Sequence, residues 1–439
     1  MADLDLVVRA RRAIVDGVER DCTLGVRDGV IVAMSAGLTA DSVLELANDE
    51  ILLPGLVDSH VHVNDPGRTS WEGFATATRA AAAGGVTTII DMPLNSIPPT
   101  VDMPALKEKQ RTAGPQVYVD VGFWGGAVPS SLGRLEELHR AGVFGFKSFL
   151  LDSGVEEFPA LTPAQFAAAL EELRGPDALM LVHAEDSEII ASARQPSGAR
   201  YDDFLASRPE SAEIMAIEGV IEAARRTGAR VHVLHLASAS ALPLIAEAKR
   251  DGVRLTVETC PHYLSFCAEE IPDGATRYKC CPPIRSAMNR EMLWRGLADG
   301  VIDCVVSDHS PATADLKVPD FGAAWGGISG LQVGLSAVWT QARPRGFSLA
   351  DAVDWLAAGP ARIAGLQRKG RLAIGCDADF VVFAPDDARV VDARQLHHRN
   401  KVSAYDGRAL AGVVRQTWLR GRAVTGESAD GILLARGDR

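Results

Sequence analysis

Two histidines separated by one residue, His60 and His62, are the first side chains in this sequence able to support metal chemistry. They lie in residues 56–63, where apolar and β-branched residues surround them and predict a short β-strand. Alternate residues of a strand point to the same face, so the two imidazoles project together, about 6–7 Å apart at their Cα atoms. Imidazole binds zinc, iron, nickel and copper. Two core histidines would give the same pattern, so the remaining sequence must decide.

Further polar residues stand near the ends of the other apolar strand patterns. Their types are those of metal ligands and acid–base catalysts, and they are Lys147, His183, His235 and Asp308. Each has an ordinary alternative when taken alone, such as a buried core histidine or a helix-capping aspartate. Together with His60 and His62, they place one set of ligand types at one end of a set of strands. We therefore interpret them as a single site.

Lys147 is the unusual member because it stands among aromatic residues in the segment 145–150. Burial of an ammonium costs several kcal/mol unless its charge is paired or lost. Burial and a nearby metal ion both lower the pKa of a lysine, which gives a neutral, nucleophilic amine. Such an amine adds CO2 to form a carbamate, an anionic ligand able to bridge two metal ions. A lysine that extends to the rim of the site is the alternative.

The segments that must position these residues alternate between strands and amphipathic helices. Eight strands are predicted, at residues 56–62, 86–91, 116–122, 143–149, 178–183, 230–236, 253–258 and 302–308. Apolar residues at helical spacing fall between them, for example at 163–174 and 210–226. This α/β pattern matches a (β/α)8 TIM barrel, whose chemistry lies at the C-terminal ends of the strands, better than an open sheet. Glycine-rich phosphate or dinucleotide fingerprints are missing after these strands.

Both ends of the chain have β patterns instead. Residues 3–53 contain short strand patterns, with an Asp28-Gly29 turn typical of a hairpin. Strand patterns return at 379–383 and 412–418. We expect one accessory domain built from residues 1–55 and 366–439, and a catalytic barrel at 56–365.

Composition limits the possible partners. The chain has 439 residues, of which 47% are hydrophobic, and a net charge of −12. These values predict a soluble globular protein and argue against nucleic acid or an anionic membrane as a partner. Seven cysteines without a CxxC pair, and no signal-peptide or membrane-spanning pattern, indicate the cytoplasm. We expect an enzyme with a small-molecule substrate.

The order His-x-His, Lys, His, His, Asp resembles the binuclear amidohydrolase superfamily, in its cyclic-amidase branch. Within that branch the sequence is most similar to the allantoinases. The segments that carry this likeness are residues 62–73, 92–95, 307–311 and 324–328. The resemblance covers nearly the whole chain and implies a TIM barrel with a small β-sandwich domain built from both termini. It also implies a homodimer or homotetramer.

The resemblance implies two divalent metal ions, with zinc as the expected metal. His60 and His62 would bind the more buried ion, His183 and His235 the more exposed one, and carboxylated Lys147 would bridge them. Asp308 would bind the buried ion and move the catalytic proton. The expected reaction is hydrolysis of the cyclic amide of allantoin to allantoate. Substrate contacts are expected from residues on the loops around the metal ions, namely Asn64, Ser310, Cys281, Gly326 and Gly327.

Three other functions stay open. Dihydroorotases have an arginine that binds the substrate carboxylate at the position of Asn64, so this sequence lacks that clamp. Hydantoinases, or dihydropyrimidinases, have a tyrosine where this chain has Asp152. Relatives that lost their metal ligands serve as non-catalytic interaction proteins, whereas all six ligand positions are filled here.

Overall fold

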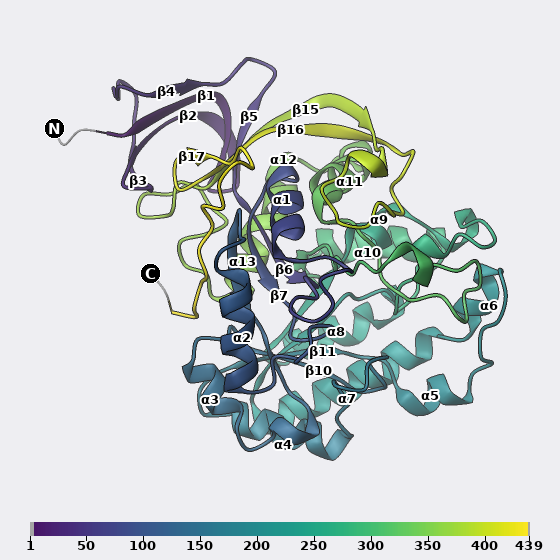
Figure 1. The fold of residues 1–439 in the computed structure, drawn as a ribbon. Helices are drawn as coiled ribbons and strands as arrows, with labels where there is room; N and C mark the ends of the chain where they lie inside the picture. The colour runs from purple at the N-terminus through teal and green to yellow at the C-terminus, as the bar shows by residue number, and fades with distance from the viewer. Residues whose placement is uncertain (1–3, 438–439) are drawn as a thin grey trace.

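A ring of parallel strands forms the centre of the molecule. In the computed structural model, which describes residues 4–437, the ring begins with β6 (Leu56–Val61), β7 (Val86–Asp91) and β8 (Asp120–Phe123). It continues through β9 (Gly125–Gly126), β10 (Phe146–Phe149), β11 (Leu179–His183), β12 (Arg230–Val233), β13 (Leu255–Thr259) and β14 (Cys304–Val305). The amide of His62 donates to the carbonyl of His309 at 2.8 Å, which joins the first and last strands. The predicted TIM barrel is confirmed (Figure 1).

Several barrel strands are shorter than the sequence predicts; β10 and β12 each lose three residues, and the third and eighth strands differ most. The third predicted strand starts at 116, but β8 starts at Asp120 because the preceding residues pair elsewhere: the carbonyl of Val117 accepts from the amide of Gly431. The eighth is predicted through 308, but β14 ends at Val305. Asp308 has a φ of 43°, a left-handed conformation that no regular strand accommodates.

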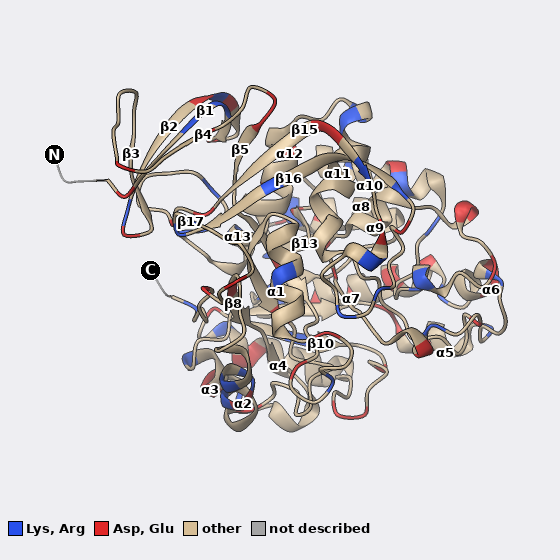
Figure 2. Cartoon of the chain, turned by 45° about the horizontal axis from the view of Figure 1, so that its top comes forward, with Lys and Arg blue, Asp and Glu red and all other residues tan. Residues whose placement is uncertain are grey.

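Helices cover the outside of the barrel. The predicted helical segments 163–174 and 210–226 correspond to α4 (Pro163–Arg174) and α7 (Glu210–Thr227). Thr162 and Gln165 form a capping box at the start of α4, and Gly228 ends α7 in the left-handed conformation. Charged residues of both signs lie on the outer helices, for example on α2 and α3 (Figure 2). The other helices are α1 (Phe74–Ala83), α2 (Met103–Ala113), α3 (Leu135–Arg140), α5 (Ser187–Ser192), α6 (Tyr201–Ala206), α8 (Leu242–Arg250), α9 (Pro261–Ser265), α10 (Ala287–Ala298), α11 (Gly334–Ala342), α12 (Leu349–Val353) and α13 (Gly359–Ala364).

One mixed sheet combines strands from both ends of the chain, in the order β17-β16-β15-β5-β1-β2-β3 with β4 beside β1. The N-terminal strands are β1 (Leu6–Val15), β2 (Val18–Arg27), β3 (Val30–Met34), β4 (Val43–Glu45) and β5 (Ile51–Pro54). The C-terminal strands are β15 (Phe380–Val390), β16 (Ala409–Leu419) and β17 (Arg422–Ala423). Asp28 and Gly29 form the predicted hairpin turn, with φ values of 51° and 75°. The boundaries at residues 55 and 366 stay a prediction.

The two parts of the fold have separate cores. Apolar side chains of the small sheet, including Val8, Ile31 and Phe380, form a cluster distinct from the large barrel core. Ion pairs of Lys369 with Asp120 on β8 and Asp379 link the two parts. Of the helices in residues 4–437, none is long and apolar enough to cross a membrane.

Candidate metal centre and substrate cavity

The C-terminal ends of the barrel strands bring all six predicted metal ligands to one cavity of about 370 Å³. They come from five different strands or the residues directly after them, and every one of their side chains is buried. The residues are His60, His62, Lys147, His183, His235 and Asp308. Sequence spacing alone therefore located the side chains that this fold gathers.

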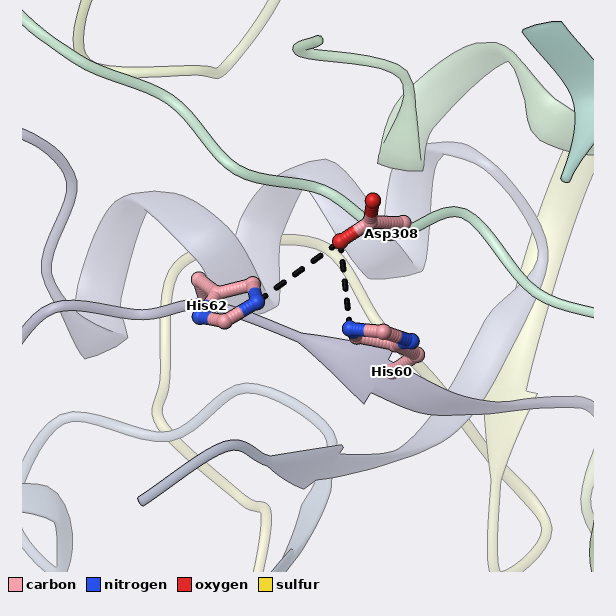
Figure 3. Close-up of side chains that lie close together, drawn as sticks. All are labelled: His60, His62 and Asp308. Atoms are coloured by element: carbon pink, nitrogen blue, oxygen red, sulfur yellow. Dashed lines mark ion pairs between the residues drawn. The ribbon is translucent and has the colours of Figure 1, made fainter. Parts of the chain in front are cut away.

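His60, His62 and Asp308 form the tightest part of the cluster (Figure 3). Oδ1 of Asp308 lies 3.1 Å from Nε2 of His60 and 3.6 Å from Nε2 of His62. One ligand atom from each of the three residues lies within 4.8 Å of the others, close enough for all three to hold one ion. Two nitrogens and one carboxylate oxygen are a donor set that suits zinc.

The electrostatics of the cluster also fit a cation. Burial and the positive charge of His60 lower the pKa of His62 to about 3, and burial lowers that of His235 far below its usual value, so both imidazoles are neutral near pH 7. Burial opposes ionisation of Asp308, but the neighbouring histidines outweigh it and lower its pKa. The site thus holds two neutral imidazoles with available lone pairs and an ionised carboxylate. Burial opposes the charge of His60, but Asp308 and Glu258 outweigh it and raise its pKa to about 9, so a metal ion that binds there displaces a proton.

His183 and His235 lie beside this group. Their ring centroids are 4.6 Å apart, and that of His235 is 5.5 Å from that of His60. Nδ1 of His235 is buried and has no hydrogen-bond partner among residues 4–437. Unpaired buried nitrogens are costly in a folded protein unless a ligand uses the site.

Lys147 lies in the same cavity with its Nζ 4.2 Å from the ring centroid of Phe149. Burial is the dominant influence and lowers its pKa to about 7, although Asp308 and Glu258 oppose the shift. About half of these amines are therefore neutral at pH 7 in the metal-free protein. This is the state that carboxylation of the amine requires.

Glu258 at the end of β13 fixes the orientation of His60. Nδ1 of His60 donates to its Oε1 at 2.6 Å, and Nε2 of His232 donates to its Oε2 at 2.9 Å. The backbone amide of His235 also donates to Oε1, at 3.1 Å. Burial alone would raise the pKa of Glu258, but His60 and His232 hold it down to about 2. One ionised carboxylate thus orients two predicted ligands.

Glu185 plays the corresponding part for His183. Nε2 of His183 donates to Oε2 of Glu185 at 2.7 Å, which leaves Nδ1 as the available ligand atom. Arg208, which lines the cavity, donates to the same carboxylate oxygen. Burial would raise the pKa of Glu185, but the charge of Arg208 outweighs it and holds the pKa at about 2.

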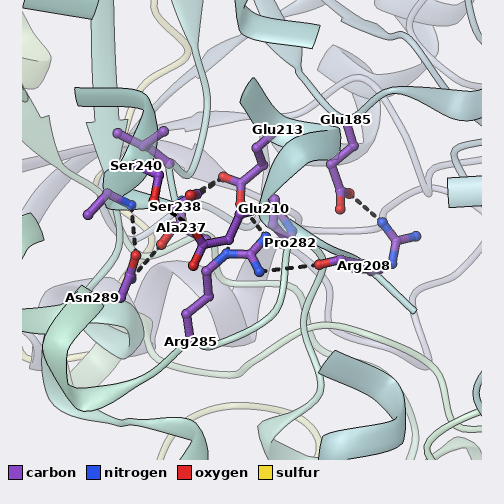
Figure 4. Close-up of polar contacts among 12 residues, drawn as sticks. Glu185, Arg208, Glu210, Glu213, Ala237, Ser238, Ser240, Pro282, Arg285 and Asn289 are labelled. Carbon is purple, nitrogen blue, oxygen red and sulfur yellow. Dashed lines mark hydrogen bonds and ion pairs between the residues drawn. The ribbon is translucent and has the colours of Figure 1, made fainter. Parts of the chain in front are cut away.

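A buried polar network supports the segment after His235 (Figure 4). Oε1 of Glu213 accepts the amides of Ala237 and Ser238, each at 3.0 Å. Arg285 donates to Oε2 of Glu213 at 2.6 Å and to the carbonyl of Arg208 at 3.2 Å. The network therefore connects the backbones that carry His235 and Arg208.

Four of the five predicted substrate contacts line the cavity: Ser310, Cys281, Gly326 and Gly327. Gly327 has a φ of 118°, and a Cβ there would lie 2.2 Å from the carbonyl oxygen of Ser310. The close approach of these two backbones therefore requires glycine at 327. At Gly326 the nearest atom to such a Cβ is Sγ of Cys281, at 3.8 Å.

Two lysines hold the loop that contains these glycines. Nζ of Lys317 donates to the carbonyls of Trp325 at 2.9 Å and Gly327 at 2.7 Å. Nζ of Lys279 donates to the carbonyl of Ala324 at 2.5 Å. The ammonium groups thus fix the wall of the cavity opposite the strands.

Asn64 is the exception, because it is not among the residues that line the cavity, and its assignment as a substrate contact stays a prediction. Its side chain is buried outside the cavity, and its Nδ2 donates to the carbonyl of Pro311 at 3.3 Å. The strand ends at Val61, and a φ of 65° at Asn64 turns the chain away from the metal ligands. Asn64 joins two loops of the site.

Sequence reasoning missed Glu258, Glu185, Arg208, Lys279 and Lys317. For the two glutamates a signal was present, because each is an acidic residue at or just beyond the end of an apolar strand pattern. For Arg208, Lys279 and Lys317 no local signal exists, since all three lie in loops; the first two line the cavity, and Lys317 holds its glycine loop from behind. The structure adds another indication: His235 and Asp308 both have positive φ, at 36° and 43°. Such strain in non-glycine residues is concentrated at functional sites.

Comparison with known proteins agrees with this arrangement. The model of the amidohydrolase family matches residues 51–424. An allantoinase of Streptomyces avermitilis is 57% identical over 97% of this chain and 96% of its own length. An allantoinase of Saccharomyces cerevisiae is 47% identical over 94% of this chain and 91% of its own. Among solved structures, the L-hydantoinase (dihydropyrimidinase) of Arthrobacter aurescens has a TM-score of 0.92 at 30% identity, covering 99% of this chain and 100% of that one.

Proposed function

The chain belongs to the amidohydrolase family, and on that premise we propose that it hydrolyses the cyclic amide of allantoin to give allantoate. The observation that carries this function is the near-full-length identity to allantoinases of a bacterium and a yeast. A cavity that presents histidines, a lysine and an aspartate together is the site of the reaction. The protein is thus an enzyme acting on a small molecule, and the non-catalytic alternative is set aside.

Proteins of this family carry a binuclear metal centre, and the His60, His62 and Asp308 cluster has the donors for a metal ion. We propose zinc as the metal, with His183 and His235 as ligands of the second ion and carboxylated Lys147 shared between the two. When bound, such ions activate water at neutral pH and polarise the scissile carbonyl. The low pKa of Lys147 supports its carboxylation.

The residues of the chain perform the remaining steps. Asp308 accepts the proton of the attacking water and returns it to the ring nitrogen that leaves. Its carboxylate is ionised before the reaction, as this role requires. Glu258 and Glu185 keep the imidazoles in one tautomer and orientation. The loop held by Lys279 and Lys317 excludes water and presents polar backbone groups to the ring.

The state of the arginines in the site supports a neutral substrate. Arg208 is paired with Glu185. Arg68, four residues beyond Asn64, pairs with Glu157 and donates to the carbonyl of Asn95 at 2.8 Å. The charges of both guanidinium groups are already paired with carboxylates, and Arg68 does not line the cavity. Burial of the dihydroorotate carboxylate without a charged partner would cost several kcal/mol. Allantoin carries no such charge.

Parallel assays test the proposal. Purified, zinc-loaded protein is supplied with allantoin, dihydroorotate and an unsubstituted hydantoin at equal concentrations, and ring opening is followed for each. We expect allantoin to be turned over roughly a hundredfold faster than dihydroorotate, as a difference of several kcal/mol implies. Faster turnover of dihydroorotate or hydantoin would refute the assignment. We also propose that the protein is cytoplasmic and forms a homodimer or homotetramer. Light scattering of the purified protein would test the oligomeric state.

A further inference from the structure

A second cavity lies where the barrel meets the sheet built from both termini. Its volume is about 540 Å³, compared with about 370 Å³ for the substrate cavity, and the two share no lining residue. Helix α1 and strand β16 both contribute to its lining, and Oγ1 of Thr417 on β16 donates to the carbonyl of Ala82 on α1 at 2.6 Å. The cavity is therefore part of the junction between the two halves of the fold.

The lining of this cavity is basic. It includes Arg79, Arg389, Arg415 and His397, and no Asp or Glu is among the lining residues. Figure 2 shows basic residues, in blue, on both α1 and β16. The chain as a whole has a net charge of −12, so this concentration of positive charge runs against its average composition.

Arg389 on β15 is the most informative of these residues. Its Nη2 is buried and has no hydrogen-bond partner within residues 4–437. Burial is the only cause that lowers its pKa, and no carboxylate offsets it. A partly buried guanidinium without an anion is costly. Its five donors in a planar fork match a phosphate or carboxylate group.

The charges of the neighbouring residues leave this positive potential in place. Arg79 lies 4.3 Å from the ring centroid of Tyr118 and donates to its hydroxyl, which is uncharged. The pKa of His397 is lowered by burial and then by the charges of Lys401 and Arg79. Arg415 is the exception, because it pairs with Asp387 at the exposed rim.

We propose that this cavity is a binding site for a small molecule that carries a phosphate or carboxylate group, with Arg389 as the principal ligand-binding residue. Arg79 supplies the second positive charge. Gln332, Gln416 and Thr425 provide polar groups for the rest of the molecule. A cavity of this volume is within the range of known small-molecule sites.

Calorimetric titration tests this proposal on the metal-loaded enzyme, with inorganic phosphate, adenosine monophosphate and citrate as separate probes. The phosphate probes and citrate distinguish a phosphate site from a carboxylate site. We expect saturable binding of at least one probe. Arg389→Gln should weaken it at least tenfold, and Arg389→Lys should weaken it less. Arg394→Gln is the matched control, because it removes the same charge from an exposed residue that pairs with Asp392 outside the cavity.

Oxyanions also bind metal ions, so the position of the probe must be established. Crystals of the wild-type enzyme soaked in selenate would locate the anion by anomalous scattering, whether or not the Arg389 variants fold. A selenate peak beside Arg389 is expected. Absence of saturable binding, equal affinity in folded Arg389→Gln, or selenate at the metal centre alone would each overturn the proposal.

Discussion

Replacing Glu258 by glutamine tests how strongly the residues behind the ligands control the metal centre. Glu258 is fully buried, and its two oxygens accept from His60 Nδ1, His232 Nε2 and the amide of His235. Glutamine keeps the shape and one acceptor oxygen but removes the negative charge. It also places an NH2 group against one of the imidazole donors. Glu258→Gln is therefore a change in charge and hydrogen bonding at nearly constant volume.

The expected effect follows from the number of bonds lost. A hydrogen bond to a charged group contributes about 1.5–3 kcal/mol, compared with about 1 kcal/mol for a neutral one. The bonds to His60 and His232 are both affected, so roughly 1–3 kcal/mol is lost from the orientation of His60. That corresponds to about a 10- to 100-fold loss of metal affinity, the range found for partners of metal-ligating histidines.

Competition with a chromophoric zinc chelator measures the affinity, and steady-state turnover of allantoin at controlled free zinc measures activity. We expect Glu258→Gln to lose activity at low free zinc and to regain part of it at high free zinc. Asp120→Asn is the matched control. Asp120 is also fully buried, but it pairs with Lys369 and Arg420 at the opposite, N-terminal end of β8. Loss of the Asp120 charge in this variant should lower the unfolding temperature of the protein and leave its zinc affinity unchanged.

Two outcomes would refute this reasoning. Wild-type zinc affinity in Glu258→Gln would show that the carboxylate does not orient His60. An equal loss of affinity in Asp120→Asn would show that both variants act through general destabilisation.

Two further predictions concern Lys147 and the glycine loop. Because the pKa of Lys147 is about 7, its reactive neutral form increases as the pH rises through 7. At a fixed concentration of dissolved CO2, the species that the amine adds, reconstitution of metal-free protein with zinc should therefore be roughly tenfold faster at pH 8 than at pH 6. Lys147→Arg should never regain activity because a guanidinium stays protonated, and a pH-independent rate or an active arginine variant would contradict carboxylation. Gly327→Ala should lower kcat/KM for allantoin at least tenfold while zinc content is retained, because its Cβ would lie 2.2 Å from the carbonyl oxygen of Ser310. The control Gly326→Ala should retain activity, because the nearest atom to its Cβ is 3.8 Å away. Equal kinetics in the two variants would show that the loop adapts.

Most of the metal centre could be predicted because its ligands follow local patterns. All but Lys147, the second residue of β10, lie at or close beyond the end of an apolar strand, so His183 and Asp308 are recognisable without knowledge of distant contacts. Glu258 could be read as a strand-end residue, but its partner His60 is 198 positions away, and only the closed barrel brings them together. Contacts of that kind depend on packing, which residue types and spacing do not specify.

The assignment of Asn64 stays a prediction for a different physical reason. It rested on correspondence with a family position two residues after His62, whereas the direction of the side chain depends on backbone conformation. The positive φ at Asn64 turns it toward Pro311. Likewise, the strand patterns at both ends predicted an accessory unit, but the pairing of β5 with β15 became evident only from the folded chain.

That pairing has a consequence for synthesis of the protein in the cell. β5 is complete once residue 54 has emerged from the ribosome, yet its antiparallel partner begins at Phe380. At typical translation rates the interval is on the order of tens of seconds. During this time the amino-terminal strands expose an unpaired edge and half of an apolar core, a form open to aggregation. Nascent chains arrested before residue 380 should therefore bind chaperones, and release of the complete chain should end that dependence.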